Sequence, residues 1–185
     1  MPRKLIYNKS PQTVSASDQV QLQATKSGAL RATNGDADVY TVTFSLDTSA
    51  YASADLVADT QAVSTTAFDQ EGGTIVVDSV VILDEDDQGV ALNLVFIQDS
   101  TSLGTENAAP TITDANARKI VGVVPIATGD YLDIGGSKVA TVRNVGLTMK
   151  AASGSQALYV AIVNGSGTPT FTATGLQAQI AVRQL

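Results

Sequence analysis

Thr-Ile-Val-Val-Asp-Ser-Val-Val-Ile-Leu, residues 74–83, is the stretch that decides the fold. A nearly continuous run of β-branched and aliphatic residues of this length is typical of a strand that is buried on both faces or lies centrally in a sandwich. Residues 84–89, Asp-Glu-Asp-Asp-Gln-Gly, interrupt the run. Residues 90–97 resume it, with Leu92, Leu94 and Phe96 alternating against Asn93. The pattern predicts a β-hairpin with a charged tip.

Period-two alternation recurs on both sides of this stretch. In residues 39–46, Tyr40, Val42, Phe44 and Leu46 share one face, which is typical of a half-buried strand. Further strands are expected over residues 61–69, 120–126, 131–134, 138–142, 145–150, 157–163 and 176–185, with 145–150 and 157–163 as a strand pair. Pro125 places the strand 120–126 at an edge or a bulge.

The sequence predicts almost no helix. Residues 113–119 are expected to form one or two helical turns, with Thr113 or Asp114 as the N-cap. Residues 47–60 are small and polar and are expected to form a loop, with room for one helical turn.

The predicted fold class is all-β: a jelly-roll-like β-sandwich of about eight to ten strands with an extended N-terminal arm. An immunoglobulin-like sandwich is the alternative, although the Cys-Trp-Cys hallmark of that fold is missing. At 185 residues the chain fits one domain. We expect an arm over residues 1–28 and a single sandwich domain over residues 29–185.

The arm differs in charge from the rest of the chain. Arg3, Lys4 and Lys9 make it basic, whereas the whole chain has a net charge of −7. One interpretation is that the arm reaches a neighbouring acidic subunit, and the alternatives are a disordered terminus or solvated charge. No long apolar stretch follows these basic residues, so the pattern does not match a secretory signal.

Composition argues against the common catalytic classes. The chain contains no His and no Cys, which removes the usual general base, the thiol nucleophile and the commonest zinc ligands. With a sequence pI near 4.3, an acidic surface should repel nucleic acid and anionic membranes. We expect a binding or structural module that is not an enzyme, needs no cofactor or metal, and binds neither nucleic acid nor membrane.

Two acidic features are candidates for chemistry. Asp84, Asp86 and Gln88, followed by Gly89, match the first half of a calcium loop, but Val95 stands where a bidentate acid would be needed. The favoured interpretation of the tip 84–87 is a turn whose charges stay in water, and calcium binding remains open. Asp78 lies within an apolar strand, where an outward face or a bulge is favoured over a catalytic pocket.

Several phrases resemble a known group of proteins. Residues 76–97, Ser102-Leu-Gly-Thr-Glu-Asn107 and Thr113-Asp-Ala-Asn116 are similar to the head decoration, or cement, proteins of tailed bacteriophages. The likeness covers about residues 37–183 and does not include the arm. It implies a jelly-roll or sandwich fold, a place on the outer capsid surface of the virion, the major capsid protein as partner, and homotrimers.

On that reading the protein is made in the host cytoplasm and stabilises the shell across subunit junctions. The expected capsid anchors lie in the arm, at Arg3, Lys4, Leu5, Ile6 and Tyr7. The alternative is a host-facing tail or fibre module that binds a surface glycan. Its tyrosine side chains would come from Tyr40, Tyr51, Tyr131 and Tyr159.

Overall fold

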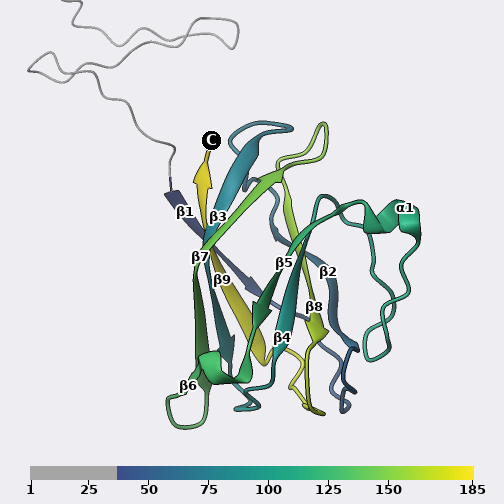
Figure 1. Ribbon diagram of the computed structural model, residues 1–185, viewed down its shortest axis with the longest axis vertical. Helices are drawn as coiled ribbons and strands as arrows, with labels where there is room; N and C mark the ends of the chain where they lie inside the picture. Colours follow the sequence, from purple (N-terminus) through teal and green to yellow (C-terminus); the bar gives the residue numbers. More distant parts are fainter. Residues whose placement is uncertain (1–36) are drawn as a thin grey trace, which may run out of the picture. The chain divides into compact units, whose positions relative to one another are not determined.

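The computed structural model describes residues 37–185, and the expected boundary between residues 28 and 29 lies outside them. Within this range the chain forms nine strands, one short α-helix and one 3-10 turn (Figure 1). Their bounds are β1 Ala37–Thr43, β2 Leu56–Ser64, β3 Thr74–Asp84, β4 Leu92–Ile97, α1 Asp114–Ala117, β5 Ile120–Ile126, η1 Thr128–Asp130, β6 Tyr131–Asp133, β7 Lys138–Lys150, β8 Leu158–Asn164 and β9 Leu176–Gln184.

The strands form two antiparallel sheets that face each other. The five-stranded sheet has the order β1-β9-β3-β7-β6, and the four-stranded sheet has the order β2-β8-β4-β5. β3 lies between β9 and β7, so the apolar run that decides the fold is a central strand, as expected. The all-β sandwich predicted from the sequence is confirmed.

The pairing follows a jelly-roll pattern. Setting aside the short β6, the first strand pairs with the last (β1 with β9), and the second with the next to last (β2 with β8). Moving inward, β3 pairs with β7 and β4 pairs with β5. Such nested pairing describes one long antiparallel ribbon wrapped into two sheets, which is the jelly-roll architecture.

The core lies between the sheets. Alternate residues of each strand point inward, and the largest fully buried side chains include Tyr51, Phe44, Phe68, Phe96 and Phe171. On β9, the inward residues Leu176, Ala178, Ile180 and Val182 are all buried. The period-two pattern seen in the sequence therefore records which face of each strand meets the core.

The two open sides of the sandwich are closed in different ways. On one side, the Gln61 side chain accepts a hydrogen bond from Ser45 N (3.1 Å) and donates one to Ser45 O (3.0 Å). On the other side β5 approaches β7 closely, because a Cβ on Gly122 would lie 2.6 Å from Leu147 Cδ1. The absence of a side chain at position 122 permits this approach.

Asp78 marks a bulge, as favoured from the sequence. The registers of β3 with both neighbours shift between Val77 and Ser79. The Asp78 carboxylate pairs with the Arg183 guanidinium on β9, with Oδ1 3.2 Å from Nη2. The bulge thus places an acid on the outer surface of an otherwise apolar strand.

The expected hairpin over residues 74–97 is wrong. β3 and β4 lie in different sheets, so the acidic tip between them crosses from one sheet to the other. The expected pair 145–150 and 157–163 is wrong for the same reason, since β7 and β8 also lie in different sheets. Alternation shows which residues point inward, but the partner strand is chosen by contacts distant in sequence.

Other boundaries also differ from expectation. The strand expected over 61–69 begins earlier, at Leu56, and the two strands expected over 138–142 and 145–150 are the single strand β7. Within β7, Asn144 and Gly146 have positive φ (57° and 64°), and the irregularity there explains the break in the sequence pattern.

Two local expectations are confirmed. Thr113 caps α1, with its hydroxyl accepting from Asn116 N at 3.3 Å. Pro125 lies in β5, which is the edge strand of its sheet. Among the described residues, no helix has the length and apolar character needed to cross a membrane.

Candidate functional site: the outer faces of the two sheets

The expected capsid anchors Arg3, Lys4, Leu5, Ile6 and Tyr7 lie outside the described residues. The two sheets differ most in what lies on their outer faces.

The outer face of the four-stranded sheet is covered by the segment 98–119, which connects β4 to β5 and is called the strap here. Figure 1 shows the strap, with α1, on the side of this sheet. Leu103 of the strap is buried against the outward side chains of the sheet, and Ile112 packs beside it. The buried residues of this second cluster are Leu56, Val95, Ile97, Leu103 and Ala161. The strap thus removes an apolar sheet face from water.

Hydrogen bonds fix the strap along β2. Leu56 N donates to Ala108 O, and Asn107 N donates to Leu56 O, both at 2.9 Å. The Asp59 carboxylate accepts from Leu103 N at 2.7 Å, and Asp59 N donates to the Glu106 side chain at 3.1 Å. The strap therefore satisfies backbone groups that an edge strand would otherwise leave unpaired.

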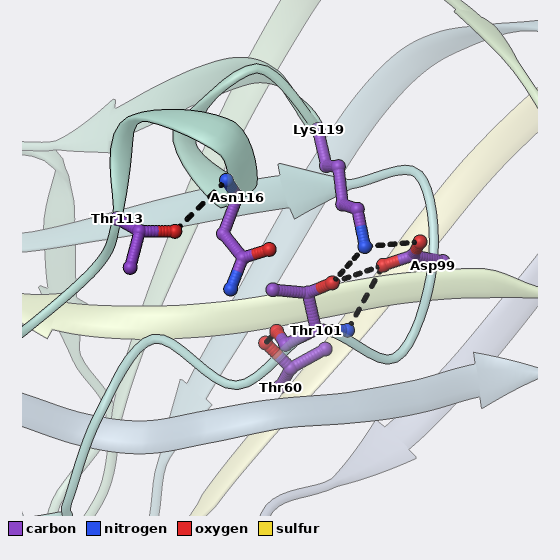
Figure 2. A network of polar contacts seen from close by, with 6 residues as sticks. All are labelled: Thr60, Asp99, Thr101, Thr113, Asn116 and Lys119. Atoms are coloured by element: carbon purple, nitrogen blue, oxygen red, sulfur yellow. Dashed lines mark hydrogen bonds and ion pairs between the residues drawn. The ribbon is translucent and has the colours of Figure 1, made fainter.

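A polar network ties the two ends of the strap together (Figure 2). The Lys119 ammonium lies 2.9 Å from Asp99 Oδ2 and donates to Thr101 Oγ1 at 2.8 Å. The Thr60 hydroxyl of β2 donates to Thr101 O at 2.6 Å. Burial alone would raise the pKa of Asp99, but hydrogen bonds from Thr101 and Lys119 outweigh it and hold that pKa below its usual range.

The five-stranded sheet has a different outer face, called the open face here. Its members point away from the core, are half-buried or exposed, and lie in register across the strands. They are Ala37, Val39, Thr41 and Thr43 of β1, Gln177, Gln179, Ala181 and Arg183 of β9, Thr74, Val76, Ser79, Val81 and Leu83 of β3, Val139, Thr141, Arg143, Thr148 and Lys150 of β7, and Leu132 of β6. Within residues 37–185 no segment covers this face as the strap covers the other (Figure 1).

The open face carries few acidic side chains. Asp78 at the bulge lies beside it and pairs with Arg183, with Oδ1 3.2 Å from Nη2. Arg143 and the exposed Lys150 of β7 are its other charged members. The charges of this face are therefore mainly basic, on a chain whose net charge is −7.

Apolar side chains are exposed on the open face. Val39, on the edge strand β1, is 64% exposed, and Leu132, on the opposite edge strand β6, is 68% exposed. Between them lie the half-buried Val81, Leu83 and Val139. Polar Gln177, Gln179 and Thr141 lie among them in the strand registers, so the apolar residues of this face are interspersed with polar ones.

The acidic tip is built differently from expectation. Asp84 is 1% exposed, and its carboxylate accepts from Asp86 N (3.1 Å) and Gly89 N (2.7 Å). Asp86 accepts from Thr172 N at 2.7 Å, and Asp87 pairs with Lys138 at 3.2 Å. The expectation that these charges stay in water is therefore wrong for Asp84, whose pKa is raised by burial. No group of three His, Cys, Asp or Glu residues within 37–185 is placed to hold a metal.

Two of the tyrosines proposed for glycan contact are turned into the protein. Tyr51 is 0% exposed, and its hydroxyl donates to Asp47 O (2.8 Å) and Val57 O (3.1 Å). The Tyr131 hydroxyl is buried without a hydrogen-bond partner among the described residues. Burial raises the pKa of both phenols. The expectation that Tyr51 serves as a surface contact is wrong.

Sequence reasoning missed both outer faces. The strap was described only as a polar stretch with a short helix, although Leu103 and Ile112 within it are apolar residues of the kind that cover a sheet. The signal for the open face is that Val39, Val81, Leu83 and Val139 occupy the outward side of strands whose inward side is also apolar. That signal requires the bulge at Asp78 to be known, because the bulge reverses the alternation along β3.

No family model matches the chain, and no curated protein matches it. Among solved structures, that of Desmodium yellow mottle tymovirus aligns over 95% of this chain and 95% of that chain, at 9% identity and a TM-score of 0.31. The infectious bursal disease virus VP2 subviral particle aligns over 91% of this chain, at 16% identity and a TM-score of 0.21. This chain spans 42% of that VP2 chain. Likenesses at these TM-scores carry no argument about function.

Proposed function

We propose that this protein is a virion structural protein, and specifically a capsid decoration protein that binds the outer surface of a phage head. The observation that carries the proposal is the open face, a sheet surface with exposed Val39 and Leu132 that no other segment of residues 37–185 covers. The similarity of residues 76–97, 102–107 and 113–116 to decoration proteins supports the finer assignment. The jelly-roll pairing is compatible with it, but lectins and cupins use the same architecture, so the fold alone does not decide.

The proposed mechanism is binding without catalysis. A protein that binds across the junction of two shell subunits adds its binding free energy to the assembled shell and stabilises that state by mass action. The proposed partner is the major capsid protein, with Arg3, Lys4, Leu5, Ile6 and Tyr7 of the N-terminal segment as anchors. The basic anchors would meet acidic or polar shell surface, and the apolar ones would enter gaps between subunits.

The direct test is binding to heads. Purified chain is incubated with purified expanded phage heads that lack decoration, and bound protein is measured by co-sedimentation and located by cryo-electron microscopy. We expect saturable binding on the outer surface and greater resistance of the heads to heat or chelator. Deleting residues 1–28 should weaken binding.

A matched control keeps the result interpretable. A variant carrying Ser100→Glu and Ala115→Glu changes two exposed strap residues and should bind heads as the native chain does. Absence of head binding by the native chain, together with a positive glycan array, would overturn the proposal in favour of the host-facing module.

A further inference from the structure

We propose that the free edge of β1 is a peptide-binding site, at which an extended segment of the shell protein adds a strand to the five-stranded sheet. The inference rests on the proposed function for the identity of the partner, and it deepens that function by naming the contact. It assigns binding to the backbone of one strand, in addition to the side chains of a face.

Half of the backbone groups of β1 point away from the sheet. Directly after β1, Phe44 N donates to Leu176 O at 3.0 Å, so these two opposite residues form a hydrogen-bonded pair. In an antiparallel ladder such positions alternate with positions whose N–H and C=O groups point the other way. Along the register of β1 with β9, the alternation turns the N–H and C=O groups of Val39, Thr41 and Thr43 outward. Within residues 37–185 no other strand pairs with β1 on that side.

The next outward position along the same edge shows what the edge binds. Both backbone groups of Ser45 are taken by the side-chain amide of Gln61, which accepts from Ser45 N at 3.1 Å and donates to Ser45 O at 3.0 Å. A side-chain amide carries the same kinds of donor and acceptor as a peptide group. Gln61 therefore occupies the position that a peptide group of an adjacent strand would take. An extended peptide backbone would supply the same pair of groups at every second residue of β1.

Of the four sheet edges within residues 37–185, β1 is the one built to accept a strand. The edge of β2 is hydrogen-bonded to the strap. β5 contains Pro125, which has no N–H to donate, and β6 has three residues. β1 has seven residues and contains no Lys, Arg or Pro, the residues with which edge strands discourage pairing. Main-chain hydrogen bonding at such an edge is a recurring mode of peptide recognition.

The side chains beside this edge indicate the chemistry of the added segment. Val39, Thr41 and Thr43 are exposed, uncharged and β-branched. Residues directly opposite each other in two adjacent strands have their side chains on the same face, where β-branched and aromatic pairs are favourable. We therefore expect a shell segment whose side chains opposite these three residues are β-branched or aromatic. The added strand would extend the open face by one strand.

Hydrogen exchange at single amides tests the pairing directly. It is measured by mass spectrometry on the dilute isolated chain and on the chain bound to expanded phage heads that lack decoration. In the isolated chain, the amides of Val39, Thr41 and Thr43 should exchange fast, whereas those of Tyr40 and Val42 should exchange slowly because they face β9. On heads, we expect exchange at the three outward amides to slow by at least about tenfold.

Two substitutions at one position separate the backbone from the side chain. Thr41→Pro removes an outward N–H without removing a hydrogen bond to β9. Thr41→Val keeps that N–H and the β-branched shape, so it is the matched control. We expect the dissociation constant for heads to rise at least about tenfold for Thr41→Pro and to change by less than about twofold for Thr41→Val. Circular dichroism verifies that both variants fold, and if Thr41→Pro does not, the exchange data on the native chain decide.

Three results would overturn the inference. The first is slow exchange at Val39, Thr41 and Thr43 in the dilute isolated chain, since the edge would then already be paired. The second is unchanged exchange at these amides on heads, and the third is equal head binding by the two folded Thr41 variants. If the native chain binds heads without slowing exchange at this edge, the inference fails while the proposed function stands. If the native chain does not bind heads, the proposed function fails, and the shell segment fails with it.

Discussion

Both sheets of this sandwich have apolar side chains on their outer as well as their inner faces. Within residues 37–185, the chain covers the outer face of the four-stranded sheet but not that of the five-stranded sheet. On the four-stranded sheet, Leu103 of the strap covers Val95 and Ile97, and hydrogen bonds to β2 hold it there. On the five-stranded sheet, no segment within residues 37–185 covers Val39 or Leu132. A face closed by its own chain contributes to stability, whereas a face left open is available for binding.

The largest contrast is expected from two leucine substitutions. Leu103→Ala should lower the free energy of unfolding by about 2–5 kcal/mol, because Leu103 is buried and its loss leaves a cavity under the strap. Leu132→Ala, at an exposed position of the open face, should change it by less than about 0.5 kcal/mol. Urea unfolding of the dilute proteins measures both. Equal losses would contradict the distinction between the two faces.

A smaller effect is expected where the strap is hydrogen-bonded to β2. Asp59→Ala removes the acceptor of Leu103 N and should cost about 1–3 kcal/mol, since that backbone N–H loses its partner. Limited proteolysis should then cut within residues 98–119 faster than in the native chain. Glu85→Ala, at an exposed position outside the strap, is the matched control. Unchanged cleavage in the Asp59 variant would show that the hydrogen bond from Leu103 N to Asp59 is not needed to hold the strap.

The two regions should also respond to pH in opposite directions. The folded-state pKa of Asp99 in the strap is lowered, so its stabilising contribution is present above its unfolded pKa and is lost as pH falls through the folded pKa. The pKa of Asp84, at the end of β3, is raised by burial, so the folded state takes up a proton before the unfolded chain does. As the pH falls, protonation of Asp84 therefore raises the free energy of unfolding, whereas protonation of Asp99 lowers it.

Unfolding free energies of the native chain, Asp99→Asn and Asp84→Asn between neutral and acidic pH measure this difference. The native chain should lose stability relative to Asp99→Asn as pH falls, by less than about 1 kcal/mol because the ion pair is partly exposed. As the pH falls toward the unfolded-state pKa of Asp84, the native chain should gain stability relative to Asp84→Asn. Parallel pH curves for all three proteins would contradict these assignments.

The smallest change in stability is expected on the open face itself. Gln179→Glu with Thr141→Glu should leave the free energy of unfolding of the dilute chain within about 0.5 kcal/mol of the native value, because both side chains are exposed. A large loss of stability in dilute solution would mean that the face has a structural role within one copy.

The sequence located most of the strands but not their partners. Alternation placed Phe44, Phe96 and Ile180 in the core, because burial of one strand face imposes a period of two. The continuous apolar run over residues 74–83 predicted the central place of β3. The alternation also predicted that β4 pairs with β3. This was wrong because a short acidic connection can either turn within one sheet or cross to the other, and here it crosses. The bulge at Asp78 and the covering role of Leu103 depend on contacts between distant segments, which a local pattern does not contain.

The most direct test of the contrast between the two faces is carbene footprinting of the dilute native chain, read at single residues by mass spectrometry. Val39 and Leu132 should be labelled strongly, whereas Leu103 should be labelled weakly because the strap buries it against the four-stranded sheet. Weak labelling of Val39 and Leu132, or strong labelling of Leu103, would contradict the account.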